Sequence, residues 1–192
     1  QGKVSLELRE KGLIKEIKSD NTPVSNGDLE VNKIVTQKLL ELTPNIPIVS
    51  EETSHNKSSS NLKNFWLVDP IDGTYDYIND LEEFTINAGL ILNRKPVAGL
   101  INAPAKNRMF YTYGKNDAYE LKNGKEIKLD CSKKTKKEFV KVVSYSNKIK
   151  PEIEKVHNLL GVNEFVRMKS SYKFCVIALS LIHISEPTRQ LQ

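Results

Sequence analysis

The stretch WLVDPIDGTYDYIN, residues 66–79, begins as an apolar strand and ends in acidic and turn-forming residues. Asp69 closes the strand, and Asp72 follows three residues later. Carboxylates this close repel each other and lose solvation at a strand end, so a compensating group is required. The pattern therefore predicts a divalent cation at this strand end.

The composition is that of a globular protein, with 39% hydrophobic and 28% charged residues in 192. The longest apolar run, near 174–184, is interrupted and too short to span a bilayer, so no integral membrane segment is expected. Cys131 and Cys175 lie far apart without a CxxC pattern, which fits a reducing cytoplasm and argues against a zinc site. The net charge of +5 fits an anionic partner or a lysine-rich solvated surface equally well.

The residues before the opening stretch predict a helix and a short strand. Residues 25–42 place apolar side chains at helical spacing, and Ser25 with Asp28 predicts a capping box at the start. Residues 46–49 predict a strand that ends at Glu51 and Glu52. Residues 53–64, rich in Ser, Asn and Lys, predict a surface loop before the strand at 65–69.

The residues after the opening stretch are dominated by strand patterns. Residues 84–92, 96–104 and 108–114 are rich in β-branched and aromatic side chains, and Asn123-Gly124 predicts a hairpin. A strand at 139–144, a helix at 150–160, a strand at 164–168 and a helix from Ser170 complete the pattern. Consecutive antiparallel strands flanked by helices favour a layered α+β fold with a largely antiparallel sheet over an all-parallel doubly wound sheet.

Three acidic residues are expected to share one pocket. Glu51 ends one strand, Asp69 ends the next, and Asp72 lies in the turn beyond, so their side chains converge if the two strands are neighbours. Oxygen ligands without His or Cys suit hard cations, Mg²⁺ above all. The alternative, in which Asp69 and Asp72 only cap a helix and stabilise a turn, is equally compatible with the spacing.

Gly73 and Thr74 precede a short predicted helix at about 75–80. The free N–H groups and positive dipole end of a helix bind phosphate, and a glycine permits close backbone approach. Carboxylates that hold a metal beside such a phosphate seat indicate metal-assisted hydrolysis of a phosphate ester.

These residues also carry a resemblance to a known family. The segment WLVDPIDGT, residues 66–74, resembles the signature of the inositol monophosphatase superfamily, the lithium-sensitive magnesium phosphatases. Four further segments are similar to its 3′(2′),5′-bisphosphate nucleotidase branch: NTPVSNGD (21–28), VSEE (49–52), EFTIN (83–87) and SSYKFC (170–175). The match runs in order from about Gly2 to Ala178 and implies the sandwich fold of sugar phosphatases.

The resemblance implies a role for each site residue. Glu51 and Asp69, with the backbone carbonyl of Ile71, would bind a first Mg²⁺, and Asp69 would bridge to a second ion held by Asp72. Gly73 and Thr74 would hold the scissile phosphate, and these metal ligands would contact the substrate as well. Asp28 would accept a hydrogen bond from Thr74, and the two would orient and deprotonate the attacking water. Glu52 has at best a supporting place, and a solvated position is expected for it.

Two departures from the family pattern affect the interpretation. Tyr75-Asp76-Tyr77 stands where the branch usually has Lys-Glu-Phe, which removes a positive charge beside the phosphate seat. After Ala178 the family continues to a Trp-Asp motif, whereas residues 179–189 (LSLIHISEPTR) agree with the translation of a sequencing-library adapter.

We therefore expect three segments. Residues 1–130 would form an α+β metal- and phosphate-binding domain, and residues 131–178 would begin a truncated C-terminal α/β domain. Residues 179–192 would be a non-native tail, irregular or helical by propensity alone. A chain of this kind is expected to have little activity by itself.

The leading functional hypothesis is a Mg²⁺-dependent nucleotidase that removes the 3′-phosphate from adenosine 3′,5′-bisphosphate, with 3′-phosphoadenosine 5′-phosphosulfate as a second substrate. An inositol or sugar phosphatase is the alternative, and a non-catalytic basic binding protein is a third hypothesis. The positive charge is dispersed, so no nucleic-acid partner is expected. The expected location is the cytoplasm, with peripheral association at the inner membrane as a variant, and the oligomeric state is left open.

Overall fold

The computed structural model describes residues 2–19, 21, 23–53, 61–115, 117–130, 140–144, 148–179 and 184–185. The chain divides into two compact units, residues 1–128 and residues 129–192, which are described separately. The expected segment boundaries, after residues 130 and 178, stay predictions. No helix in the described part of the chain is both long and apolar enough to cross a membrane.

The first unit is built on a seven-stranded sheet. The strands lie in the order β3 (Ile48–Ser50), β4 (Phe65–Asp72), β5 (Thr85–Leu92), β6 (Lys95–Ala103), β7 (Arg108–Tyr113), β8 (Asp117–Lys122) and β9 (Lys125–Lys128). Only the β3–β4 pair is parallel, and the other neighbours in this sheet are antiparallel. Tight turns such as the one at Asn123-Gly124, where both φ angles are positive, permit this up-and-down order.

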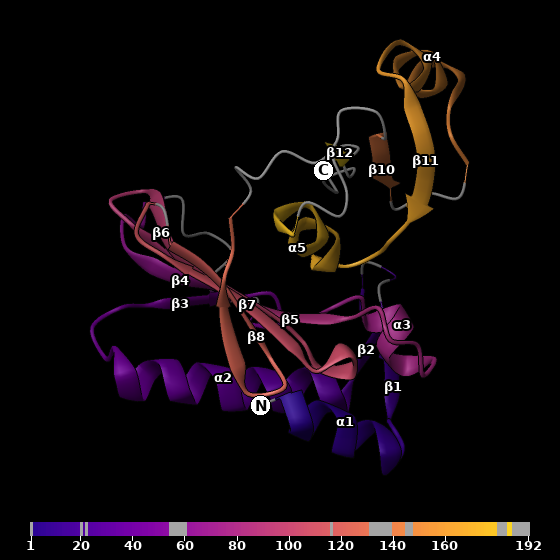
Figure 1. Ribbon diagram of the computed structural model, residues 1–192. Coiled ribbons are helices and arrows are strands. Elements are labelled where there is room, and N and C mark those ends of the chain that lie inside the picture. Colours follow the sequence, from indigo (N-terminus) through magenta and orange to yellow (C-terminus); the bar gives the residue numbers. More distant parts are fainter. Residues whose placement is uncertain are drawn as a thin grey trace. The chain divides into compact units, whose positions relative to one another are not determined.

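Helices α1 (Gly2–Glu10) and α2 (Asn26–Leu42) lie along one face of this sheet (Figure 1). A small antiparallel pair, β1 (Lys15–Ile17) and β2 (Pro23–Ser25), leads directly into α2. Helix α3 (Thr74–Ile78) follows β4, and the 3₁₀ turn η2 (Pro104–Lys106) joins β6 to β7.

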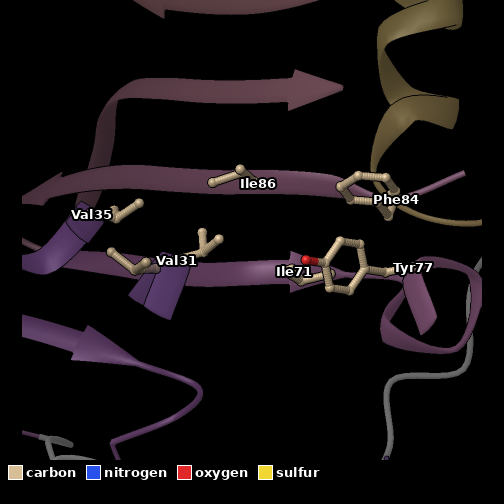
Figure 2. Packing of buried hydrophobic residues seen from close by; sticks show 7 residues of the cluster. Val31, Val35, Ile71, Tyr77, Phe84 and Ile86 are labelled. Atoms are coloured by element: carbon tan, nitrogen blue, oxygen red, sulfur yellow. The ribbon is translucent and has the colours of Figure 1, made fainter. Parts of the chain in front are cut away.

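The core of the first unit lies between α2 and the sheet. Apolar side chains from the helical stripe of α2 meet alternate residues of β4 and β5, as periods of 3.6 and 2 require. Tyr77 and Phe84 close one end of this core, with ring centroids 4.9 Å apart. Figure 2 shows the buried cluster, which consists of Val31, Val35, Val68, Ile71, Tyr77, Phe84 and Ile86.

The pairing of the end of β4 with β5 is irregular around Pro70. The register to β5 shifts between Asp69, which faces Asn87, and Asp72, which faces Thr85. Proline cannot donate to the ladder and is tolerated at such bulges, which also increase the local twist. The bulge brings both aspartates to the same strand end.

The second unit contains a parallel three-stranded sheet in the order β11 (Val162–Arg167), β10 (Val140–Ser144) and β12 (Ile184–Ser185). Helix α4 (Pro151–Leu159) connects β10 to β11, and α5 (Tyr172–Ala178) follows β11. Parallel neighbours require such crossover connections.

The α+β class and the largely antiparallel sheet of the first unit are confirmed. Residues 179–192 were expected to be irregular or helical. This is wrong at 184–185, where the strand β12 pairs with Val142 and Val143. The loop expected at 53–64 lies partly outside the described residues, at 54–60. Helix α1 and the β1–β2 pair were not predicted.

Candidate active site

The parallel pairing of β3 with β4 brings the two predicted strand ends together. Ser50 faces Val68 in the register, and the Glu51 N–H donates to the Val68 carbonyl at 3.1 Å. Glu51 and Asp69 are therefore the next residues along two adjacent strands. The neighbouring strands on which the sequence made the convergence of the carboxylates conditional are present.

Asp69 is a buried carboxyl group among other carboxylates. Burial raises its pKa to about 8, and the charges of Glu51 and Asp72, a hydrogen bond with Glu51 and the charge of Asp28 add to the rise. Because a pKa of about 8 lies above neutral pH, the protonated form of Asp69 is favoured there. Its Oδ1 atom is buried and has no hydrogen-bond partner among the described residues. A buried oxygen without a partner carries a cost of about 1–3 kcal/mol, which a cation would remove.

Asp72 lies on the other side of the bulge. The Thr85 hydroxyl donates to Asp72 Oδ2 at 3.4 Å, a long bond that leaves the carboxylate weakly held by this partner. Its charge reaches Asp69 and contributes to the raised pKa there. The structure thus places Glu51, Asp69 and Asp72 in one electrostatic group.

The side chains of these three residues do not form a complete set of metal ligands in this structure. Among the described residues, no three His, Cys, Asp or Glu side chains are grouped so that they could hold a cation. The Glu51 side chain is half-exposed, and its Oε1 lies 3.9 Å from the Lys18 ammonium. The two strand ends are adjacent, but convergence of the three carboxylates on one point stays a prediction.

Asp28 and Thr74 meet as the sequence predicted. The Thr74 hydroxyl lies 2.9 Å from Asp28 Oδ1 and 3.0 Å from the Ile71 carbonyl, and can donate its one proton to either. Asp28 Oδ2 accepts from the Ser25 N–H at 2.8 Å and from the Ser25 hydroxyl at 2.6 Å, which completes the capping box of α2. Asp28 is fully buried, so its capping role and its contact to Thr74 coexist.

Gly73 joins β4 to α3 in a conformation that only glycine adopts easily. Its φ is +99°, and a Cβ at this position would lie 2.7 Å from the Glu83 carbonyl oxygen. The helix that follows has five residues, and its first bond runs from the Tyr77 N–H to the Gly73 carbonyl. A helix this short has a small dipole, so the predicted phosphate seat depends mainly on local N–H groups.

The structure places two further residues, Lys18 and Glu52, beside Glu51, which the sequence did not reveal. Lys18 Nζ lies 2.8 Å from Glu52 Oε1, and the Glu52 side chain is only 6% exposed. The expectation that Glu52 is solvated is wrong, because Lys18 shields and pairs it. Burial lowers the pKa of Lys18, but the hydrogen bond and charge of Glu52, with Glu51 and Asp28, raise it above its ordinary value overall. No local sequence signal marks a contact between residues 34 positions apart.

The donor set fits a hard divalent cation. It consists of carboxylate oxygens and one backbone carbonyl, and one of the carboxylate oxygens is buried without a hydrogen-bond partner. The pKa of Asp69, raised by burial and by the neighbouring carboxylates, also indicates that a positive charge would stabilise this site.

The inositol monophosphatase family matches residues 2–186, and the chain belongs to this family. The resemblance inferred from the segments around residues 21–28, 49–52 and 66–74 is thereby confirmed.

Similar proteins are found both by sequence and by structure. The 3′(2′),5′-bisphosphate nucleotidase CysQ of Buchnera aphidicola is 35% identical over 163 residues, which are 84% of this chain and 60% of that protein. CysQ from Bacteroides thetaiotaomicron has a similar fold, with a TM-score of 0.71 and 24% identity over 94% of this chain and 73% of that one.

An IMPase/NADP phosphatase complexed with Mg²⁺ and phosphate has a TM-score of 0.68 and 20% identity, covering 88% of this chain and 62% of that one. The chain spans 42% to 64% of the length of the curated relatives that it matches.

Proposed function

We propose that the protein is a metal-dependent phosphomonoesterase that hydrolyses the 3′-phosphate of adenosine 3′,5′-bisphosphate to AMP and phosphate. The observation that carries the proposal is the Asp28–Thr74 hydrogen bond beside the buried, partnerless Asp69 oxygen. The sequence relatives named 3′(2′),5′-bisphosphate nucleotidase support the choice of substrate. The same site would accept 3′-phosphoadenosine 5′-phosphosulfate.

Mg²⁺ is the proposed cofactor, in line with a structural neighbour that holds Mg²⁺ and phosphate. Glu51, Asp69, Asp72 and the Ile71 carbonyl would hold it. When bound, the cation acts as a Lewis acid and neutralises charge on the phosphate oxygens. Asp69 would give up its proton on binding, because the attraction between the cation and the carboxylate would outweigh the burial that raises its pKa.

The chain's own residues provide the proton path. When Thr74 donates its proton to Asp28 Oδ1, the lone pairs of the hydroxyl are free to accept a hydrogen bond from a water molecule. This contact orients the water toward the phosphorus, and the Asp28 carboxylate can take up a proton through the hydroxyl. The two Ser25 hydrogen bonds fix the carboxylate for this task.

Gly73 shapes the substrate side of the site. A side chain here would collide with the Glu83 carbonyl, so the backbone after β4 can turn as it does only with glycine. The backbone at Gly73 and Thr74 would then contact the scissile phosphate. Tyr75, which is exposed, occupies the position where the nucleotidase branch has a lysine, so substrate preference must be measured.

The test is phosphate release with Mg²⁺ from adenosine 3′,5′-bisphosphate and from inositol monophosphate. We expect the nucleotide to be hydrolysed faster, and the ratio of the two rates decides even where both rates are low. A preference for inositol monophosphate would replace the nucleotidase by an inositol phosphatase. Unchanged release after Asp69→Asn would contradict both enzymes, because each depends on this carboxylate. Absence of release from either substrate would favour a non-catalytic binding protein.

A further inference from the structure

The Lys18 ammonium lies beside two members of the carboxylate cluster, which is defined here as Asp28, Glu51, Glu52, Asp69 and Asp72. It contacts Glu52 Oε1 at 2.8 Å and Glu51 Oε1 at 3.9 Å. Its side chain is 24% exposed. A positive charge is therefore already built into the group of residues that would receive Mg²⁺.

The backbone holds Lys18 in this position. Lys18 follows β1 directly, and its carbonyl accepts from the Asn21 N–H at 2.9 Å in the turn to β2. The ladder between β1 and β2 ends in Ser25, the residue that caps α2 and binds Asp28. The ammonium is thus tied to the same framework as Asp28.

The two contacts of Lys18 are unequal. The pair with Glu52 is short, and Glu52 is nearly buried, so breaking this pair leaves an uncompensated charge in a poorly solvated place. The pair with Glu51 is long, and the Glu51 side chain is half-exposed. Glu52 therefore anchors the ammonium, and Glu51 is the partner that can leave.

We propose that Lys18 is a positioning residue that serves as an internal counter-ion of the carboxylate cluster and competes with Mg²⁺ for Glu51. Glu52 keeps the ammonium beside Glu51, and a cation that binds Asp69 takes Glu51 away from it. Lys18 then lowers the affinity for the cation. When the cation is absent, the ammonium reduces the repulsion between the carboxylates. This rests on the metal site of the proposed function.

The expected change in Mg²⁺ affinity on replacing Lys18 follows from the geometry of its ion pair with Glu51. A half-exposed ion pair shifts an equilibrium by about fivefold at most, and removing it frees Glu51 for the cation. Loss of the repulsion between the ammonium and Mg²⁺ adds to this gain. Replacing Lys18 by a neutral side chain should therefore tighten Mg²⁺ binding about fivefold or more.

The experiment measures the Mg²⁺ dissociation constant by titration calorimetry for the wild type, Lys18→Met and Lys18→Arg. We expect Lys18→Met to bind Mg²⁺ about fivefold more tightly, although its metal-free melting temperature falls because Glu52 loses its partner. Lys18→Arg keeps the charge and should resemble the wild type. A purely structural role would give weaker binding in Lys18→Met, so weaker or unchanged binding overturns the proposal.

A second pair of variants covers the case in which Lys18→Met does not fold. Glu52→Gln and the double variant Lys18→Met/Glu52→Gln both lack the buried charge of Glu52, and they differ only at Lys18. The double variant should bind Mg²⁺ more tightly than Glu52→Gln, and equal affinities would refute the competition.

Phosphate release by the wild type, measured in parallel, separates the two proposals. Mg²⁺-dependent release with no effect of Lys18→Met on the dissociation constant overturns the inference alone. No Mg²⁺ binding and no release overturn the proposed function as well.

Discussion

At the scale of single residues, the candidate site is marked by a buried carboxyl group whose environment is unfavourable. Asp69 is buried beside Glu51, its protonated form is favoured at neutral pH, and its Oδ1 has no hydrogen-bond partner among the described residues. Such arrangements cost stability and concentrate at functional sites. The Asp28–Thr74 pair, in contrast, is fully satisfied by its neighbours.

The Asp69→Asn variant separates stability from metal binding. The amide keeps the shape and removes one of the repelling acids, so the metal-free melting temperature should stay equal or rise by a few degrees. The rise in melting temperature that Mg²⁺ causes in the wild type should disappear. Asp117→Asn, which removes a carboxylate on β8 paired with Lys128, is the control and should keep the Mg²⁺ effect. A full Mg²⁺ effect in Asp69→Asn would exclude Asp69 as a ligand.

Gly73→Ala tests the turn between β4 and α3. The methyl group would lie 2.7 Å from the Glu83 carbonyl at a φ of +99°, so we expect a loss of about 1–3 kcal/mol in urea unfolding. Gly124→Ala is the matched control, since its φ of +74° is also positive but nothing lies within 4 Å of the added carbon. Equal losses for the two variants would show that the close approach to Glu83 has no consequence.

At the scale of elements, the sequence predicted what local chemistry determines. The apolar spacing and the Ser25–Asp28 box predicted α2 nearly to its ends, and Asn123-Gly124 predicted the β8–β9 hairpin. It could not predict α1, whose buried residue in the described helix is a serine, Ser5, and which has no acidic first turn. The pairing of Lys18 with Glu52 depends on tertiary packing, which no local pattern encodes.

The start of α2 links helix stability to the site, because Ser25 binds Asp28 with both its N–H and its hydroxyl. Ser25→Ala should destabilise the fold by about 1 kcal/mol, the usual cost of a lost N-cap, and lower phosphate release by loosening Asp28. Thr36→Ala, within the same helix, removes a hydroxyl that bonds only to backbone carbonyls and should change neither property appreciably. Wild-type turnover in Ser25→Ala would argue against a need for a fixed Asp28.

At the scale of the whole molecule, each predicted site residue belongs to the first unit, which has its own core. The order of strands and turns predicted the fold class. The pairing of β3 with β4, which brings Glu51 next to Asp69, was only assumed as the condition for the carboxylates to converge. The strand β3 itself was expected from residues 46–49, but its partner was not, because sheet order depends on which faces pack together.

Residues 1–128 should therefore fold alone. We expect a fragment of these residues to unfold in one cooperative transition in urea, followed by circular dichroism, because its sheet, helices and core are complete within it. A gradual loss of signal without a transition would mean that the first unit requires residues 129–192.

The central claim is that the carboxylates around Asp69 form a divalent cation site. The most direct test is a crystal structure of the chain grown with Mn²⁺, which takes the place of Mg²⁺ and is located by its anomalous scattering. We expect a peak about 2.0–2.2 Å from a carboxylate oxygen of Asp69, with Glu51 turned toward it and away from Lys18. Well-ordered carboxylates without a peak, at a concentration that saturates any binding seen in solution, would contradict it.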